Sequence, residues 1–285
     1  MDFGALCQDI EKLGINLYDL AVYHDGRIEA HRFQPCNNCN NCYSVAKAFM
    51  ITAVGMLCDD GLLDVKNPLH FYMGDLMPKD VDPAWQLVTV EDVLKHQIGF
   101  DEGFLDIDTD DASLFPSRDF LDIVFHHPIV HLPGQHYQYS DAAYYLVSRL
   151  CSHVAGERVD ELLSRRLFEP LKVREAAWSC CPQHHPIGAT GLYLSAADMV
   201  KLPALYLEGG VWMGQRIVSE SWVQQVIRNE YEFEFKTPAG LIGKGGMYGQ
   251  MILFSREKRF AAAWHAFTTD GDSMARLIDF FSHLN

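Results

Sequence analysis

A serine and a lysine three positions apart carry the clearest chemical signal in this sequence. Ser44 and Lys47 stand where a helix is predicted to begin, after the Asn- and Cys-rich run 36–42. Residues at positions i and i+3 share one helix face, so the lysine amine can approach the serine hydroxyl. The positive end of a helix favours negative charge on the serine oxygen and disfavours a second cation, so a buried Lys47 would act as a base. Ser44 is therefore the candidate nucleophile.

The same spacing also has a purely structural interpretation. Serine is a favoured N-cap residue, and a lysine one turn later commonly lies on a solvated helix face. The neighbours of Lys47 are apolar, however, and small or apolar residues continue without a breaker to Asp59. This pattern predicts a helix that is buried on all sides, in which a lysine needs a partner or a chemical role.

Composition and charge limit the partners that we expect. The chain has 285 residues, 48% of them hydrophobic, and a formal net charge of −15. This charge argues against a nucleic-acid partner, since phosphate binding needs a basic face, and against an anionic membrane surface. We expect a small-molecule substrate instead. No apolar run is long enough to span a bilayer, and Met1–Gly4 do not resemble a signal peptide, which predicts a cytoplasmic protein.

Eight cysteines suggest a second kind of chemistry. Cys36, Cys39 and Cys42 have the spacing Cys-x-x-Cys-x-x-Cys, which is compatible with zinc or with part of an iron–sulfur cluster. A tetrahedral site needs a fourth ligand, and no fourth cysteine follows at cluster spacing. We therefore expect free thiols in a loop of a cytoplasmic protein, with no metal and no cofactor.

Predicted strands lie near both ends of the chain, and helices lie between them. A helix over 2–13 precedes strands 15–23 and 27–33, which an Asp-Gly turn joins. Two apolar runs, 247–254 and 260–267, predict a second hairpin before a closing helix. The helices predicted between these segments cover 44–59, 89–96, 116–125, 140–155, 159–167, 195–207 and 219–228.

This order predicts an α/β (α+β) fold: an antiparallel sheet built from both termini and flanked by helices, with an inserted, mostly helical domain. The predicted boundaries place 1–60 and 186–285 in the sheet domain and 61–185 in the inserted domain. Residues 101–111 carry six acids. Asp106, Asp108 and Asp110 have the alternation of a calcium loop, but Asp111 stands where that loop needs glycine, so we interpret the segment as a solvated acidic loop.

The order of the motifs resembles that of the class C β-lactamase and penicillin-binding-protein-like serine hydrolases. Ser44-Val45-Ala46-Lys47 is similar to their first motif, and Pro133-Gly134 followed by Tyr139-Ser140-Asp141 is similar to their second. Framework stretches also match, at 169–171, 190–199 and 208–210, so the resemblance covers most of the chain. It implies a β-lactamase/transpeptidase-like fold and an acyl-enzyme on Ser44, with Lys47 and Tyr139 sharing the roles of general base and proton donor.

The second motif departs from the family at Asp141, where an asparagine is usual. An amide can donate a hydrogen bond to a substrate carbonyl, whereas a carboxylate only accepts. Asp141 could instead bind Lys47 and hold it charged, which would weaken Lys47 as a base. This departure argues against β-lactam turnover more than against hydrolysis in general.

The third motif, Lys-Thr-Gly or His-x-Gly in the family, has two alignments. Lys244-Gly245-Gly246 would supply a cation without the hydroxyl, whereas Leu241-Ile242-Gly243 would supply none. In the first alignment Lys244 and Gly246 contact the substrate, and the oxyanion hole consists of the backbone N–H groups of Ser44 and Met247. His265 is a further candidate, for which a strand histidine with a structural partner is the simpler interpretation.

The resemblance favours a serine hydrolase that forms an acyl-enzyme on Ser44 and acts on a small ester, amide or D-amino-acid peptide. The sequence Gly-x-Tyr-Gly-Gln at 246–250 also resembles the branch of the family that acts on esters and amides of small oligomers. Two alternatives stay open. One is a ligand- or penicillin-binding protein of the same fold that has lost turnover, and the other is a zinc or redox protein that uses Cys36, Cys39 and Cys42.

Overall fold

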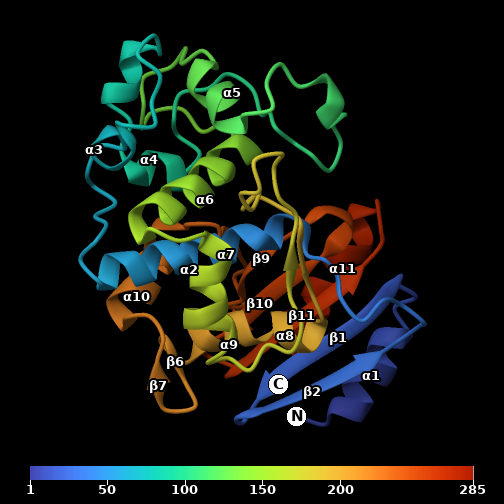
Figure 1. Ribbon diagram of the computed structural model, residues 1–285. Helices are drawn as coiled ribbons and strands as arrows, with labels where there is room; N and C mark the ends of the chain where they lie inside the picture. Colours follow the sequence, from blue (N-terminus) through green and yellow to red (C-terminus); the bar gives the residue numbers. More distant parts are fainter. Residues whose placement is uncertain (285) are drawn as a thin grey trace.

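Both ends of the chain build one antiparallel sheet. The computed structural model describes residues 1–284. Within them, six strands follow the order β2-β1-β11-β10-β9-β8, and β1 pairs with β11, so the first and last long strands lie side by side (Figure 1). Their bounds are β1 Leu17–His24, β2 Arg27–Arg32, β8 Phe235–Lys236, β9 Ile242–Gly245, β10 Met251–Ser255 and β11 Phe260–Ala266. The predicted fold class is confirmed.

Helices cover both faces of this sheet, which explains why its central strands read as continuous apolar runs. Successive side chains of a strand point to opposite faces. Ile252 and Phe254 accordingly face the larger core, while Leu253 and Trp264 face a smaller core beneath α1 (Phe3–Glu11) and α11 (Gly271–Ser282). On the opposite face, α8 (Ala196–Met199) and α9 (Lys201–Leu207) pack against β10, β11 and β1.

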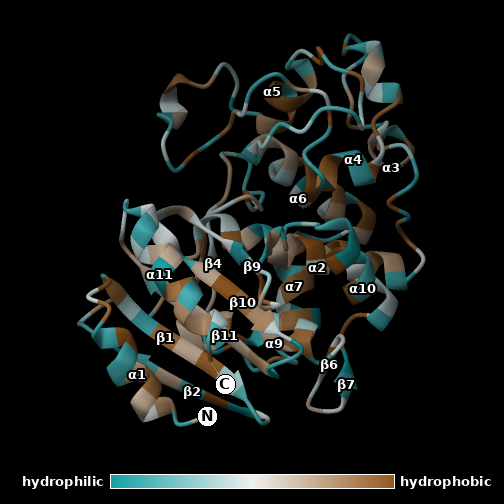
Figure 2. Ribbon diagram, turned by 180° about the vertical axis from the view of Figure 1, so that it is seen from behind, coloured by the Kyte–Doolittle hydropathy of each residue, from teal (hydrophilic) through white to brown (hydrophobic). Residues whose placement is uncertain are grey.

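The helix that follows Ser44 is the central element of the larger core. This helix, α2 (Ala46–Asp59), buries every residue from Ala46 to Leu57, which confirms the prediction of a helix buried on all sides. Figure 2 shows it as predominantly hydrophobic. The helix begins two residues later than predicted, because Ser44 belongs to a 3-10 turn, Tyr43–Val45, and its side chain forms no cap. The left-handed backbone of Tyr43 (φ 48°) leads into this turn.

A group of helices lies across α2 from the sheet (Figure 1). The longest of them, α6, is preceded by Ser140 and ends at Gly156, whose left-handed backbone (φ 69°) suits a residue without a side chain. Part of the inserted segment returns to the sheet side, where β4 pairs with β5. The domain boundaries at 60/61 and 185/186 stay a prediction. The helices of this segment are α3 His70–Met73, α4 Val90–Leu94, α5 Phe120–His126, α6 Asp141–Ala155 and α7 Val159–Leu163.

Several predicted boundaries differ from the structure. The predicted strand 247–254 begins at Met251, because Met247–Gly249 forms a 3-10 turn with Tyr248 in the left-handed region (φ 59°). Strand β9 was not predicted, since its sequence, Ile-Gly-Lys-Gly, has too few apolar residues to signal a strand. The remaining elements are β3 Asn40–Asn41, β4 Ala177–Trp178, β5 Leu192–Leu194, β6 Val211–Trp212, β7 Gln215–Arg216 and α10 Glu220–Asn229. Within residues 1–284, no helix has the length and apolar character needed to cross a bilayer.

A glycine in α2 allows α10 to pack closely against it. A Cβ atom at Gly55 would lie 2.2 Å from Nε1 of Trp222. We therefore expect Gly55→Ala to lower the free energy of unfolding by about 1–3 kcal/mol through overpacking, although alanine is the better helix former. Urea denaturation measures this change. The control is Gly4→Ala in α1, where the nearest atom to the new Cβ lies at 3.5 Å, and there we expect no loss. Equal midpoints for the two variants would contradict the prediction.

Candidate active site

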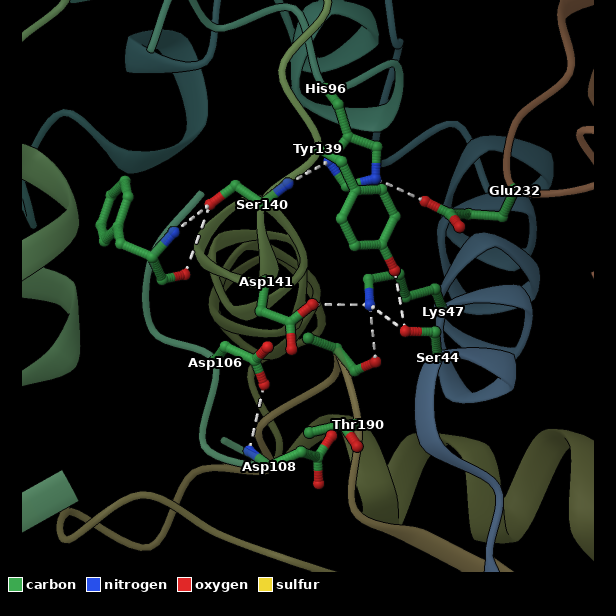
Figure 3. A network of polar contacts seen from close by, with 12 residues as sticks. Ser44, Lys47, His96, Asp106, Asp108, Tyr139, Ser140, Asp141, Thr190 and Glu232 are labelled. Carbon is green, nitrogen blue, oxygen red and sulfur yellow. Dashed lines mark hydrogen bonds and ion pairs between the residues drawn. The ribbon is translucent and has the colours of Figure 1, made fainter. Parts of the chain in front are cut away.

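The side chains of Lys47 and Tyr139 meet at Ser44 Oγ (Figure 3). Lys47 Nζ lies 3.0 Å from this oxygen, and the Tyr139 hydroxyl donates a hydrogen bond to it over 2.8 Å. Ser44 lies in the 3-10 turn before α2, Lys47 in the first turn of α2, and Tyr139 in the loop before α6. The serine, the amine and the phenol are close enough to exchange protons directly.

The Lys47 ammonium is fully buried, at 0% exposure, and each of its three hydrogens has an acceptor. Besides Ser44, it donates to Asp141 Oδ1 at 2.8 Å and to the carbonyl of Ala189 at 2.9 Å. Burial lowers the pKa of Lys47, but the carboxylate of Asp141 more than compensates, so that the pKa lies above its ordinary value. In the resting site Lys47 is therefore charged and donates to Ser44.

Two of these three acceptors fix the direction of the amine. The carboxylate of Asp141 and the carbonyl of Ala189 can only accept hydrogen bonds, so they take two hydrogens whether Lys47 is charged or neutral. The third direction faces Ser44 Oγ. A charged Lys47 donates along it, whereas a neutral Lys47 would accept along it. The contact between Lys47 and Ser44 is thus a direct proton path.

A second buried lysine approaches Tyr139 from β9. Lys244 is 2% exposed, and its ammonium lies 2.6 Å from Glu232 Oε2 and 2.8 Å from Glu234 Oε1. Burial lowers the pKa of Lys244, but the field of Glu232 outweighs it and holds the pKa above its ordinary value. The Lys47 and Lys244 ammonium groups lie 4.8 Å and 5.2 Å from the centroid of the Tyr139 ring. Both would stabilise negative charge on the phenol oxygen during proton transfer.

The position of Lys244 agrees with the alignment that takes Lys244-Gly245-Gly246 as the third motif. In the other alignment Leu241 would begin the motif, but Leu241 is buried in the smaller core beneath α1 and α11. Gly246 lies against the chain that leads to Ser44: a Cβ atom there would be 2.6 Å from the carbonyl oxygen of Cys42 and 3.3 Å from Ser44 N. Glycine is therefore required for the end of β9 to approach the candidate nucleophile.

The backbone near Ser44 also suits the predicted oxyanion hole. Ser44 lies in the first turn of one 3-10 helix, and Met247 begins another. The first N–H groups of such a turn have no carbonyl of their own turn to bind, so they are available to a substrate oxygen. Next to them, Tyr43 and Tyr248 form an edge-to-face pair with ring centroids 5.4 Å apart. Both have left-handed backbone, a strain that commonly accompanies functional sites.

Sequence reasoning missed two residues of this site, His96 and Glu232. Nδ1 of His96 accepts the N–H of Ser140 at 3.2 Å, so its proton is on Nε2 and is donated to Glu232 Oε1 at 2.8 Å (Figure 3). The His96 ring lies on the Tyr139 ring, with centroids 4.5 Å apart. His96 thus contacts Tyr139 directly, and Glu232 connects it to Lys244. Neither residue belongs to one of the three family motifs.

The acidic loop is not fully solvated, so that prediction is wrong for Asp106 and Asp108. Both are partly buried, because the loop folds back and Asn41 donates a hydrogen bond to Asp108 at 3.4 Å. Oxygens of Asp106, Asp108 and Asp141 all lie within 4.8 Å of one another (Figure 3). Burial raises the pKa of Asp108 above its ordinary value, and the neighbouring carboxylates of Asp141 and Asp106 raise it further.

The other candidates from the sequence have different surroundings. Among residues 1–284, the group of Asp106, Asp108 and Asp141 is the one cluster of potential metal ligands with atoms this close, and the cysteines at 36, 39 and 42 do not form another. None of the eight cysteines is in a disulfide. His265 is fully buried in β11, and its Nδ1 lies 2.8 Å from Asp19 Oδ1 on β1. This contact agrees with a strand histidine that has a structural partner.

Comparison with known proteins agrees with this geometry. The sequence model of the beta-lactamase family matches residues 14–280. The chain belongs to the beta-lactamase family. A curated relative, the 6-aminohexanoate-dimer hydrolase of Paenarthrobacter ureafaciens, is 28% identical over 195 residues, which cover 65% of this chain and 49% of the relative. The chain thus spans about half the length of this relative.

Solved structures share the fold at low sequence identity. A structure from Bacillus anthracis, described as a candidate 6-aminohexanoate-dimer hydrolase, superimposes with a TM-score of 0.81 at 16% identity and covers 98% of this chain and 81% of that one. A class C beta-lactamase mutant superimposes with a TM-score of 0.70 at 13% identity and covers 98% and 95% of the two chains. Residues 1–284 therefore adopt the β-lactamase/transpeptidase-like fold.

The buried ion pair between Glu232 and Lys244 generates a prediction for stability. The field of Lys244 and the hydrogen bond from His96 overcome the effect of burial and hold the pKa of Glu232 far below its ordinary value. A lowered pKa stabilises the fold above the unfolded value of about 4.3, and this contribution is lost as the pH falls below it. We expect Glu232→Gln to cost about 3–5 kcal/mol at pH 7 and progressively less below about pH 4.

The matched control is Glu234→Gln, which removes the other partner of Lys244. The side chain of Glu234 is 44% exposed, so we expect a cost below about 1 kcal/mol. Urea denaturation of both variants between about pH 3 and pH 7 measures the difference. Equal costs, or a cost for Glu232→Gln that does not change with pH, would show that the pair is not the stabilising interaction.

Proposed function

We propose that this protein is a serine hydrolase that forms an acyl-enzyme on Ser44 and acts on a small ester, amide or D-amino-acid peptide. The observation that carries the proposal is the convergence on Ser44 Oγ of the Tyr139 hydroxyl at 2.8 Å and Lys47 Nζ at 3.0 Å. A serine hydroxyl is a weak nucleophile unless a neighbouring group takes its proton, and both of these groups are within reach.

Tyr139 is the better candidate for the first proton acceptor. Lys47 is charged at rest because Asp141 faces it, so it lacks the lone pair that a base needs. Tyr139, between two ammonium groups, would first lose its phenol proton to solvent. Its phenolate would then take the Ser44 proton while Ser44 Oγ forms a bond to the substrate carbonyl carbon. The N–H groups of Ser44 and Met247 would bind the developing oxyanion, and Tyr139 would then return the proton to the leaving group. Water would release the acyl group by the reverse sequence of proton transfers.

The relatives support hydrolysis of a small amide or ester. The name of the Paenarthrobacter ureafaciens relative describes the hydrolysis of a dimer of an amino acid, and we extend that chemistry, not that substrate, to this chain. Asp141 has a carboxylate, which can only accept hydrogen bonds and already pairs with Lys47. This position therefore has no amide N–H to donate to a substrate carbonyl. For this reason we favour an esterase or amidase over an enzyme that turns over β-lactams.

Labelling with a fluorescent fluorophosphonate, followed by mass spectrometry of the peptides, tests the proposal. We expect one adduct, on Ser44, and hydrolysis of p-nitrophenyl acetate by the unlabelled protein. Ser44→Ala should abolish both. Tyr139→Phe removes one hydroxyl and should slow labelling by about 10²–10⁴-fold with an unchanged urea midpoint. No adduct on the native protein, or equal labelling of Ser44→Ala, would overturn the proposal.

A ligand- or penicillin-binding protein without turnover is the second candidate. Asp141, which keeps Lys47 charged, is the observation that favours it, because deacylation also needs a base. Penicillin distinguishes the two functions in the same mass-spectrometric assay. A Ser44 adduct of penicillin that persists, together with no ester hydrolysis, would support the binding function.

A further inference from the structure

Lys244, the lysine of β9 beside Tyr139, is not available to a substrate anion. An unpaired lysine beside the nucleophile would attract a carboxylate on the substrate. Lys244, however, is 2% exposed and already lies between Glu232 at 2.6 Å and Glu234 at 2.8 Å. Two carboxylates share one ammonium group, so this cluster carries an excess negative charge. A substrate carboxylate here would meet Glu234 instead of a free cation.

A cavity of about 510 Å³ opens beside this cluster. Its lining includes His96 and Glu232, so it begins one side chain away from Tyr139. The charged groups that line it are three carboxylates, of Glu230, Glu232 and Glu234, and one ammonium group, of Lys95. Lys95 lies 3.4 Å from Glu91, and Glu230 lies 2.8 Å from Lys236, so each of these two has a partner of its own. Glu234 is half-exposed and shares the ammonium group of Lys244 with Glu232, so its negative charge is only partly compensated.

An aromatic ring stands next to these carboxylates. Tyr137 lines the same cavity and is 55% exposed. Burial of its hydroxyl raises the pKa of Tyr137 to about 12, and the negative charges of Glu234 and Glu232 contribute to the shift. A carboxylate beside an accessible aromatic face is the combination that binds ammonium groups, through ion pairing and cation–π attraction.

The opposite side of the site is acidic as well. Lys47 is paired with Asp141, and oxygens of Asp106 and Asp108 lie within 4.8 Å of a carboxylate oxygen of Asp141. Around Ser44 and Tyr139, five carboxyl groups thus accompany two ammonium groups, and His96 is neutral in the tautomer that its partners require. Such a potential attracts cations and repels anions before they bind. The net charge of the whole chain, −15, has the same sign.

We propose that the substrate of this hydrolase carries a positively charged ammonium group, which binds between Glu234 and the ring of Tyr137, and that carboxylate-bearing substrates are disfavoured. This inference rests on the proposed function, because it names the substrate class of the same site. The chemistry of recognition is that of an aminoacyl ester or amide, or of an ester of an amino alcohol.

Pairs of esters that differ only in charge test this proposal. The first pair is butyrylcholine and its carbon isostere, in which a tert-butyl group replaces trimethylammonium. The second pair places the same two groups at the end of the acyl chain of a p-nitrophenyl ester, and a third ester carries a carboxylate there. We expect kcat/KM to favour the cationic ester about tenfold in at least one pair, and the carboxylate ester to be the poorest substrate.

A variant and a salt series identify the source of the preference. Glu234→Gln should reduce the ratio of kcat/KM between the cationic and the isosteric ester to about two or less. Glu161→Gln, at an exposed position of α7, changes the net charge by the same amount and should leave this ratio unchanged. Raising the salt concentration from about 0.02 to 0.5 M should also reduce the ratio in the native protein.

The outcomes separate this inference from the proposed function. If the uncharged esters are hydrolysed but neither cationic ester is preferred, or if both glutamate variants behave alike, the inference is wrong and the hydrolase proposal stands. Faster cleavage of the carboxylate ester would also overturn it. If no ester is cleaved and no fluorophosphonate reacts with Ser44, the proposed function fails and the inference fails with it.

Discussion

The structure around the candidate nucleophile depends on one buried ion pair, between Lys47 and Asp141. Moving an ammonium group out of water costs several kcal/mol unless a counter-charge and hydrogen bonds replace the lost solvent. Asp141 at 2.8 Å and the carbonyl of Ala189 at 2.9 Å provide both. Because Lys47 belongs to α2 and Asp141 to the first turn of α6, this pair also fixes the two central helices relative to each other. The remaining hydrogen of the ammonium then has one direction left, toward Ser44.

The same principle applies on the other side of Tyr139, with different consequences. Lys244 is buried and pairs with the carboxylates of Glu232 and Glu234. His96 donates a hydrogen bond to Glu232, and its ring packs against the ring of Tyr139. The phenol therefore stands between two cations that are individually compensated by acids. They can stabilise charge on the phenol oxygen at short range, whereas at longer range the acids dominate the potential. One arrangement thus accounts for both the proposed base and the proposed preference for cationic substrates.

Local patterns in the sequence were sufficient to predict much of this. The i, i+3 spacing of Ser44 and Lys47 and the apolar residues around them predicted a lysine in a buried helix. The resemblance to the family singled out Tyr139, Asp141 and the third-motif Lys244. The Asp-Gly turn predicted the first hairpin, which the pairing of β1 with β2 confirms. Each of these features is determined by neighbours in the sequence or by a short motif.

The residues that were missed depend on long-range packing. His96 and Glu232 are separated by 136 positions, and both adopt left-handed backbone that no residue type at these positions signals. Glu232 precedes a two-residue strand, and β9 has only four residues, too few for a hydrophobic period to emerge. Asp106 and Asp108 looked solvated because their own segment is polar, whereas their burial comes from the approach of Asn41 and Asp141.

The charge state of Lys47 at rest is the central claim, and nuclear magnetic resonance measures it most directly. In protein labelled with ¹³C and ¹⁵N lysine, the Lys47 signal is assigned by its loss in the Lys47→Met/Asp141→Asn double variant, which removes both charges. We predict that Lys47 stays protonated at neutral pH and loses its proton above the ordinary lysine value of about 10.4, and that Asp141→Asn alone lowers this pKa. A neutral Lys47 at neutral pH, or a pKa that Asp141→Asn leaves unchanged, would contradict the account.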